Sequence, residues 1–115
     1  MTPYQFTVTI GASAVNLAVA AINAGAVLPG SGQLFTSTYI PAAKISVQAK
    51  SGNTGSVYIG GSNVSSAGAN AMWALTAGQL LSDESQNDHN VLNLASFYIH
   101  GGTAGDTALV TYHQL

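Results

Sequence analysis

The chain has 115 residues, enough for one domain with a single core, and it contains no cysteine, which excludes a disulfide framework, a thiol nucleophile and a cysteine-based zinc site. Charged residues make up 5% of the chain, whereas soluble domains average about 25%, and the two cations, Lys44 and Lys50, are too few for the phosphate contacts of nucleic-acid binding. So few charges protect a monomer poorly against association, and this composition favours a protein that works in an assembly.

The first predicted element is a strand. Phe6, Val8 and Ile10 alternate with threonines, which is the period of a strand with one buried face. The segment that follows, 12–28, is the only membrane candidate, but it is rich in alanine and shorter than the roughly 20 strongly apolar residues that a span needs. No lysine or arginine precedes Lys44, so the basic region of a signal peptide is also missing, and the sequence predicts no membrane partner.

Residues 13–20 fit two structures. Val15, Leu17 and Val19 alternate as in a strand, whereas Val15, Val19 and Ile22 also fit one face of a helix. The β-branched residues favour the strand. Turn chemistry follows at 23–25 and 28–32.

The clearest strand covers 43–50, where Ile45, Val47 and Ala49 share one face and both lysines lie on the other. The stretch "SGNTG" then breaks the strand, and "SVYIG" begins another. Two strands joined by a short glycine-containing loop predict a β-hairpin, with Gly52 and Gly55 in backbone conformations of positive φ.

The remaining elements repeat this pattern of short strands and turns. We expect a loop at 61–70, two short strands around Ala77-Gly78, an acidic loop at 82–90, a strand near 97–100 with His100 exposed, and a last strand with Ala108, Val110 and Tyr112 on one face. About eight short strands predict an all-β fold, an antiparallel β-sandwich of jelly-roll type, as a single domain over residues 1–115.

The glycines of "SGNTGSVYIGGSNVSS", 51–66, do not match a nucleotide-binding loop. A P-loop needs a lysine after its last glycine, and a dinucleotide fingerprint needs its glycines between a strand and a helix. Here the glycines lie before and after a strand, so turn, strand, turn is the better interpretation, and no cofactor is predicted.

The titratable residues suggest no strong catalytic or metal site. The loop residues Asp83, Glu84 and Asp88 lack the EF-hand pattern, so a solvated loop is favoured over calcium. The histidines come from separate segments without metal-binding spacing, and no G-x-S-x-G elbow is present. A hydrolase would need a cleft that joins His100 or His113 to Asp106 or Asp88; we expect no enzyme. His89, the third histidine, lies in the same acidic loop as Asp88.

The aromatic residues are the best candidates for partner binding. Trp73, the only tryptophan, follows Met72, and both bury a large apolar area at interfaces. With Tyr58, Tyr98 or Tyr39, an exposed Trp73 could stack on a sugar, although a tryptophan in the core is the commoner outcome. We expect Met72, Trp73, Tyr58 and Tyr98 to form the partner-binding surface.

Several motifs resemble small virion proteins of tailed bacteriophages. They are "AAKISVQAKSGNTGSVYIGGSNVSS", "LTAGQLLS" and "LASFYIHGGTAGDTALVTY", and the resemblance covers about residues 43–113. The chain departs from the pattern in its extra residues around "SDESQNDHN".

The resemblance implies a structural protein of the capsid exterior, of the cement or decoration type. It implies a homotrimer that binds the major capsid protein on the outer surface of the virion, with no catalytic residue. Residues 1–12, which have no obvious hairpin partner, are then expected to form an N-terminal arm or edge strand. The alternative is a head or tail fibre module, or a carbohydrate-binding module with exposed aromatics.

Overall fold

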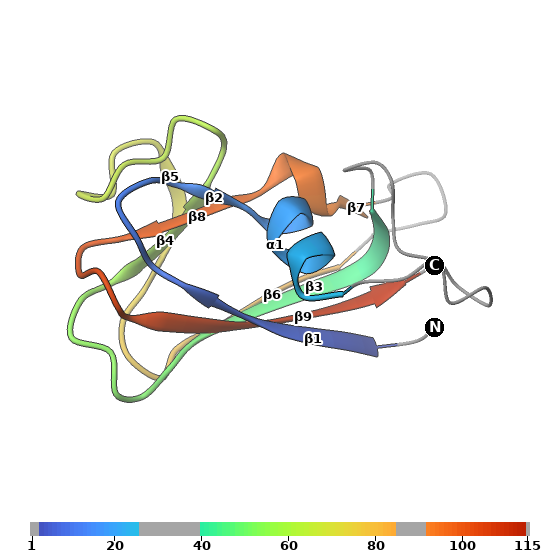
Figure 1. Cartoon of the computed structure of the whole chain (residues 1–115), viewed down its shortest axis with the longest axis horizontal. Coiled ribbons are helices and arrows are strands. Elements are labelled where there is room, and N and C mark those ends of the chain that lie inside the picture. Colours follow the sequence, from blue (N-terminus) through green and yellow to red (C-terminus); the bar gives the residue numbers. More distant parts are fainter. Residues whose placement is uncertain (1–2, 26–39, 85–91, 115) are drawn as a thin grey trace.

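The structure is a computed structural model that describes residues 3–25, 40–84 and 92–114. Within these ranges the chain forms two antiparallel sheets that face each other (Figure 1). Sheet A contains, in spatial order, β1 (Pro3–Thr9), β9 (Thr107–Gln114), β3 (Pro41–Ala49) and β6 (Leu80–Glu84), with the short β7 (Leu92–Asn93) also paired to β3. Sheet B contains β2 (Val15–Asn16), β8 (Tyr98–Gly101), β4 (Val57–Gly60) and β5 (Ala71–Leu75).

The strand order is that of a jelly roll. If the short β7 is left aside, each strand lies in the opposite sheet from the strand before it, except β5, which pairs with β4 in sheet B. Eight main strands wound in this way make two sheets whose strands alternate along the chain. The prediction of an all-β, antiparallel sandwich of jelly-roll type is confirmed.

The core forms where the inward faces of the sheets meet. Val47 lies beside Val110 in sheet A, and Ile59 lies beside Ile99 in sheet B, and all four are at most 1% exposed. Burial of each such side chain contributes about 1.5–3 kcal/mol relative to exposure. The alternation predicted for Ile45, Val47, Ala49 and for Ala108, Val110, Tyr112 is observed.

The strand favoured for residues 13–20 is wrong over most of its length. Only Val15–Asn16 is extended, and α1 (Leu17–Asn23) follows at once, beside the β1 and β2 margins of the sandwich (Figure 1). The Asn16 side chain caps the helix, because its Oδ1 accepts hydrogen bonds from the backbone N–H groups of Ala18 and Val19 at 2.9 and 3.2 Å. This cap and the alanines favour the helix over the extended chain.

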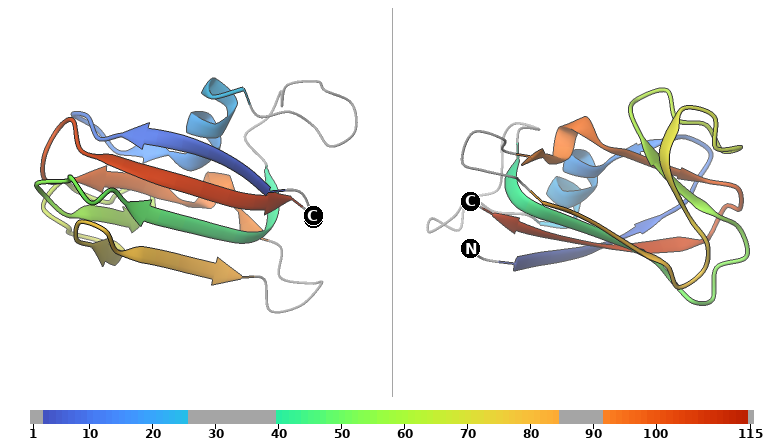
Figure 2. Two further views of the ribbon diagram at one scale, coloured as in Figure 1. Left: turned by 90° about the horizontal axis from the view of Figure 1, so that it is seen from below. Right: turned by 180° about the vertical axis from the view of Figure 1, so that it is seen from behind.

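The predicted hairpin between residues 43–50 and 56–60 is also wrong. β3 pairs with β9 and β6 in sheet A, whereas β4 pairs with β5 and β8 in sheet B. The connecting loop therefore crosses from one sheet to the other, as the views from below and behind show (Figure 2). The local pattern could not reveal this, because a short loop with glycines fits both connections.

Among the described residues, the N-terminal segment forms one of the two edge strands of sheet A. β1 pairs with β9 in one continuous register, from Pro3 opposite His113 to Thr9 opposite Thr107. Residues 3–9 are therefore part of the sandwich and not a free arm. At the other margin, β6 continues through Glu84, so the first residues assigned to the acidic loop belong to a strand.

Residues 26–39 and 85–91, with the turn expected at 28–32 and with Tyr39, Asp88 and His89, lie outside the described residues. Among the helices of the described ranges, none has the length and hydropathy needed to cross a membrane.

Candidate functional site

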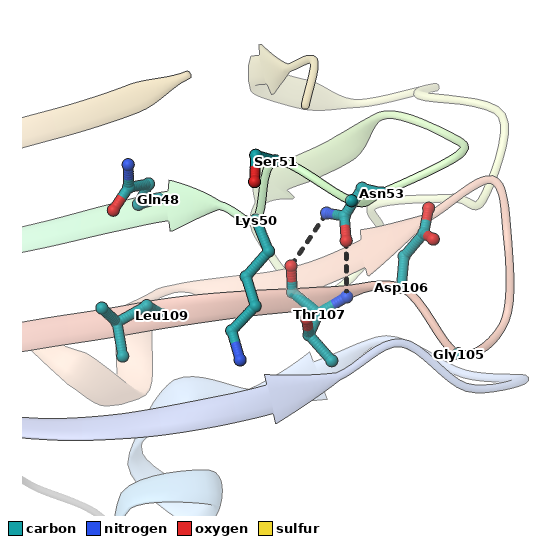
Figure 3. A pocket seen from close by; sticks show the side chains of 9 residues that line it. Gln48, Lys50, Ser51, Asn53, Gly105, Asp106, Thr107 and Leu109 are labelled. Carbon is teal, nitrogen blue, oxygen red and sulfur yellow. Dashed lines mark hydrogen bonds between the residues drawn. The ribbon is translucent and has the colours of Figure 1, made fainter. Parts of the chain in front are cut away.

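Two loops that cross between the sheets lie side by side at one end of the sandwich. The first arch, residues 50–56, joins β3 to β4, and the second arch, residues 102–106, joins β8 to β9. The Asn53 side chain pairs with the main chain of Thr107: its Nδ2 donates to the carbonyl at 2.8 Å and its Oδ1 accepts from the N–H at 3.0 Å (Figure 3). One amide side chain thus extends the pairing of sheet A into the first arch.

Asp106, which lies in the second arch, also holds the first arch in place. Its carboxylate accepts hydrogen bonds from the backbone N–H of Thr54 at 3.0 Å and of Gly55 at 2.7 Å, and the residue is only 8% exposed. Hydrogen bonds to an ionised carboxylate are stronger than neutral ones, and they satisfy donors that burial would otherwise leave unpaired. Both carboxylate oxygens of Asp106 are therefore hydrogen-bonded to the backbone of the first arch.

The glycines of the first arch serve a different purpose from the predicted one. Neither Gly52 nor Gly55 has a positive φ. A Cβ at Gly55 would lie 2.7 Å from Oγ1 of Thr103 in the second arch. Gly55 is required by the close approach of the two arches and not by its backbone conformation.

An open hollow of about 510 Å³ lies where the first arch meets the outer face of sheet A (Figure 3). Gln48, Lys50 and Leu109 line it, together with the main-chain region around Asn53 and Asp106. The residues that line it include one ammonium group and one carboxylate, but no histidine. This set of side chains can bind a small polar group.

The structure places the two described histidines in different sheets. His113 lies on β9, and His100 lies on β8, where it is 8% exposed and its Nδ1 accepts from the N–H of Gly101 at 2.9 Å. The prediction that His100 is exposed is wrong. Among the described residues, no group of three or more histidine, cysteine or acidic side chains could hold a metal ion.

The outer face of sheet B, on which His100 lies, is partly covered by another part of the chain. The loop at 61–70 packs on this face: a Cβ at Gly68 would lie 2.8 Å from Cε1 of Tyr58, which is the neighbour of His100 across β4 and β8. Val64 anchors the loop and is 4% exposed. Alternation along β8 cannot reveal a cover that comes from a loop more than 30 residues earlier in the chain.

The four aromatic and methionine candidates all lie in sheet B, but they do not share one face. Trp73 is half-buried against the core, with its ring 6.3 Å from that of Phe97 between centroids. Tyr58 and Tyr98 alternate with the inward residues of β4 and β8 and are half-buried. Met72 is 55% exposed and lies at a bulge in β5. Trp73 therefore belongs to the sandwich interior more than to a surface.

Sequence reasoning missed the role of the two residues that organise the arches: Asn53 was not singled out, and Asp106 was considered only for a hydrolase cleft. Each lies in a glycine-containing turn, where asparagine and aspartate commonly bond to nearby backbone. The sequence signal was therefore present, but the partners of these side chains lie more than 50 residues away. No protein-family model, no curated protein and no solved structure matches this chain.

Proposed function

We propose that the protein is a structural protein of a phage virion that binds the outside of the capsid and stabilises it by bridging capsomers. The observation that carries the proposal is the strand order, because double-sheet jelly rolls are a common architecture of viral capsid and lectin domains. A fold alone does not determine function, so the proposal also rests on the resemblance of residues 43–113 to tailed-phage virion proteins.

The outer face of sheet A is the surface we assign to the major capsid protein. Neutral hydroxyl and amide side chains dominate it, and their desolvation on docking costs less than that of charged groups. If many copies of the protein bind one capsid, their individually weak contacts add up to a strong overall attachment. The neutral polar residues of this face are Gln5, Thr7, Thr9, Ser46, Gln48, Ser82 and Thr111. Lys44, Leu80 and Leu109 lie on the same face.

The first experiment measures where the protein is found. Quantitative mass spectrometry of purified particles should give a copy number comparable with that of the major capsid protein, and electron microscopy of labelled particles should place the label on the head surface. Absence from particles, or only a few copies at the tail, contradicts the proposal. The oligomeric state, for which the resemblance implies a trimer, is measured on protein from the same purified particles.

The second experiment tests the surface. Gln48→Lys with Thr111→Lys places two charges on the neutral face, and we expect weaker co-sedimentation with capsids and a lower temperature of capsid disruption. The matched control is Ser62→Lys with Ser66→Lys, which adds the same charge to exposed positions of the loop at 61–70. Equal binding by both variants would show that the outer face of sheet A does not bind the capsid.

A carbohydrate-binding or fibre module is the second candidate, favoured by the exposure of Met72 beside the tyrosines of sheet B. A glycan array followed by titration monitored through Trp73 fluorescence tests it. Binding that Tyr98→Ala abolishes, without capsid association, would replace the first proposal.

A further inference from the structure

One of the two lysines of the chain has no acid to pair with. Lys50 lies one residue beyond β3 and lines the hollow beside the first arch, on the same outer face of sheet A as Gln48. It is exposed, and its side chain runs across β9 beside Thr107 (Figure 3). No described residue forms an ion pair with its ammonium group. The positive charge of Lys50 is therefore compensated only by solvent.

Asp106 also lines this hollow but does not supply the missing acid. Its two carboxylate oxygens accept from the backbone N–H groups of Thr54 and Gly55, at 3.0 and 2.7 Å. In Figure 3 the carboxylate points away from the Lys50 side chain. The carboxylate of the hollow is thus directed at the first arch, and an acid for Lys50 has to come from another molecule.

Lys44, the other lysine, is placed differently. It lies on the same face nearer the start of β3, where the register sets it across from Glu84 of β6. Opposite charges at directly opposed positions of a sheet stabilise each other. The two lysines therefore form a matched pair, because they share their charge and their face and differ in the acidic position of the neighbouring strand.

The hollow around Lys50 is held in shape by hydrogen bonds. The N–H of Lys50 donates to the carbonyl of Thr107 at 3.2 Å, and the carbonyl of Lys50 accepts from the N–H of Asn53 at 3.1 Å. The Asn53 side chain binds the main chain of the same Thr107. Walls that are already ordered lose little conformational freedom when a ligand enters, so less of the contact energy is spent on ordering them.

We propose that an acidic side chain of the major capsid protein enters this hollow and pairs with Lys50. The assignment rests on the proposed function, and it names the chemical group that the capsid presents there. Docking of the outer face of sheet A removes water from the Lys50 ammonium, and a charge that loses its water without gaining a partner is strongly destabilised. A carboxylate of the partner replaces that water, whereas a neutral partner surface does not.

The other side chains of the hollow suit a carboxylate. Gln48 and Ser51 line it, and an amide N–H and a hydroxyl can both donate to a carboxylate oxygen. One pair of opposite charges on a mainly neutral face also fixes where the partner docks, because a shifted position leaves both charges unpaired. Lys50 is therefore expected to contribute specificity as well as affinity.

The first test compares the two lysines. Lys50→Gln leaves the capsid carboxylate without its partner, so we expect co-sedimentation with capsids to weaken roughly tenfold, and Lys50→Glu to weaken it further because like charges then meet. Lys44→Gln is the matched control, with the same change of charge on the same face, and should weaken binding less. Circular dichroism checks that the variants fold. Equal losses from Lys50→Gln and Lys44→Gln, or no loss from Lys50→Gln, overturn the proposal.

The second test identifies the group that Lys50 contacts. A carbodiimide joins an amino group to a carboxylate in contact with it through an amide bond, with loss of water. Purified particles treated in this way should contain a peptide in which Lys50 is linked to an aspartate or glutamate of the major capsid protein, which mass spectrometry detects. Particles that carry the protein without this link overturn the proposal and leave the proposed function standing.

A third test needs no capsid. A short blocked peptide with one central glutamate should shift the amide NMR signals of residues 48–53 and 105–109, the same peptide with glutamine should not, and Lys50→Gln should abolish the shifts. No difference between the two peptides overturns the proposal, whatever the particles show. Shifts with the glutamate peptide in a protein that is absent from particles would overturn the proposed function and the capsid as partner, and would keep the acid-binding hollow.

Discussion

The first arch and the loop at 61–70 come from one continuous stretch of similar composition, yet they are held in opposite ways. The arch is held by Asn53 and Asp106 through hydrogen bonds that span more than 50 residues. The loop closes mainly on itself, for example through Oγ of Ser65, which accepts from the N–H of Ala69 at 3.0 Å. Connections between sheets therefore need distant partners, whereas a connection within one sheet can rely on local turns.

The largest expected effect breaks the distant support of the arch. Asp106→Ala removes the acceptor of two backbone N–H groups, and we expect the free energy of unfolding to fall by about 2–4 kcal/mol. Chemical denaturation measures this change. Asp106→Asn keeps one acceptor oxygen and should lose less; equal losses for both would show that the carboxylate does not hold the arch.

Asn53 should follow with a smaller loss. Asn53→Ala leaves the N–H and carbonyl of Thr107 without this partner, which should cost about 1–2 kcal/mol. Asn53→Asp should cost at least as much, because a carboxylate cannot donate to the Thr107 carbonyl and adds a negative charge near Asp106. If Asn53→Asp is as stable as the unmodified protein, the paired hydrogen bonds do not matter.

The loop at 61–70 is tested by comparing two glycines of positive φ. Gly68 has a φ of 88° and lies against the Tyr58 ring, whereas Gly78 has a φ of 84° and open space around it. Alanine at either position costs about 1 kcal/mol of backbone strain. Gly68→Ala should lose more than Gly78→Ala in thermal unfolding, and the excess measures the packing of the loop on Tyr58. Equal losses of stability for the two variants would mean that the Tyr58 ring moves aside at no cost.

The smallest effect belongs to a purely local contact. Ser65→Ala removes hydrogen bonds to the N–H groups of Ala67 and Ala69, both of which are exposed, so water replaces them. We expect a loss of about 0.5 kcal/mol. Hydrogen exchange should show faster opening of residues 65–70 without a change at the arch; a loss as large as that of Asp106→Ala would erase the contrast between the two regions.

Much of the fold was predictable from local patterns. The alternation at Ile45, Val47 and Ala49 and at Val57 and Ile59 correctly identified strands and their buried faces. The loop at 61–70 and the turn at Gly78 were also predicted, since their chemistry is local. The candidate site was predicted less well: Trp73 turned out to pack against the core, and the roles of Asn53 and Asp106 were not recognised.

The sequence by itself determined that this protein is an all-β sandwich with few charges, because a period of two and a charge count need no knowledge of distant contacts. Tertiary structure alone decided that residues 50–56 cross between sheets and that His100 is buried. Each of these depends on parts far along the chain: the second arch for the first, and for the second the cover of the outer face of sheet B, where Gly68 lies against Tyr58, the neighbour of His100. Such partners are chosen by the packing of the two sheets, which no short window of sequence contains.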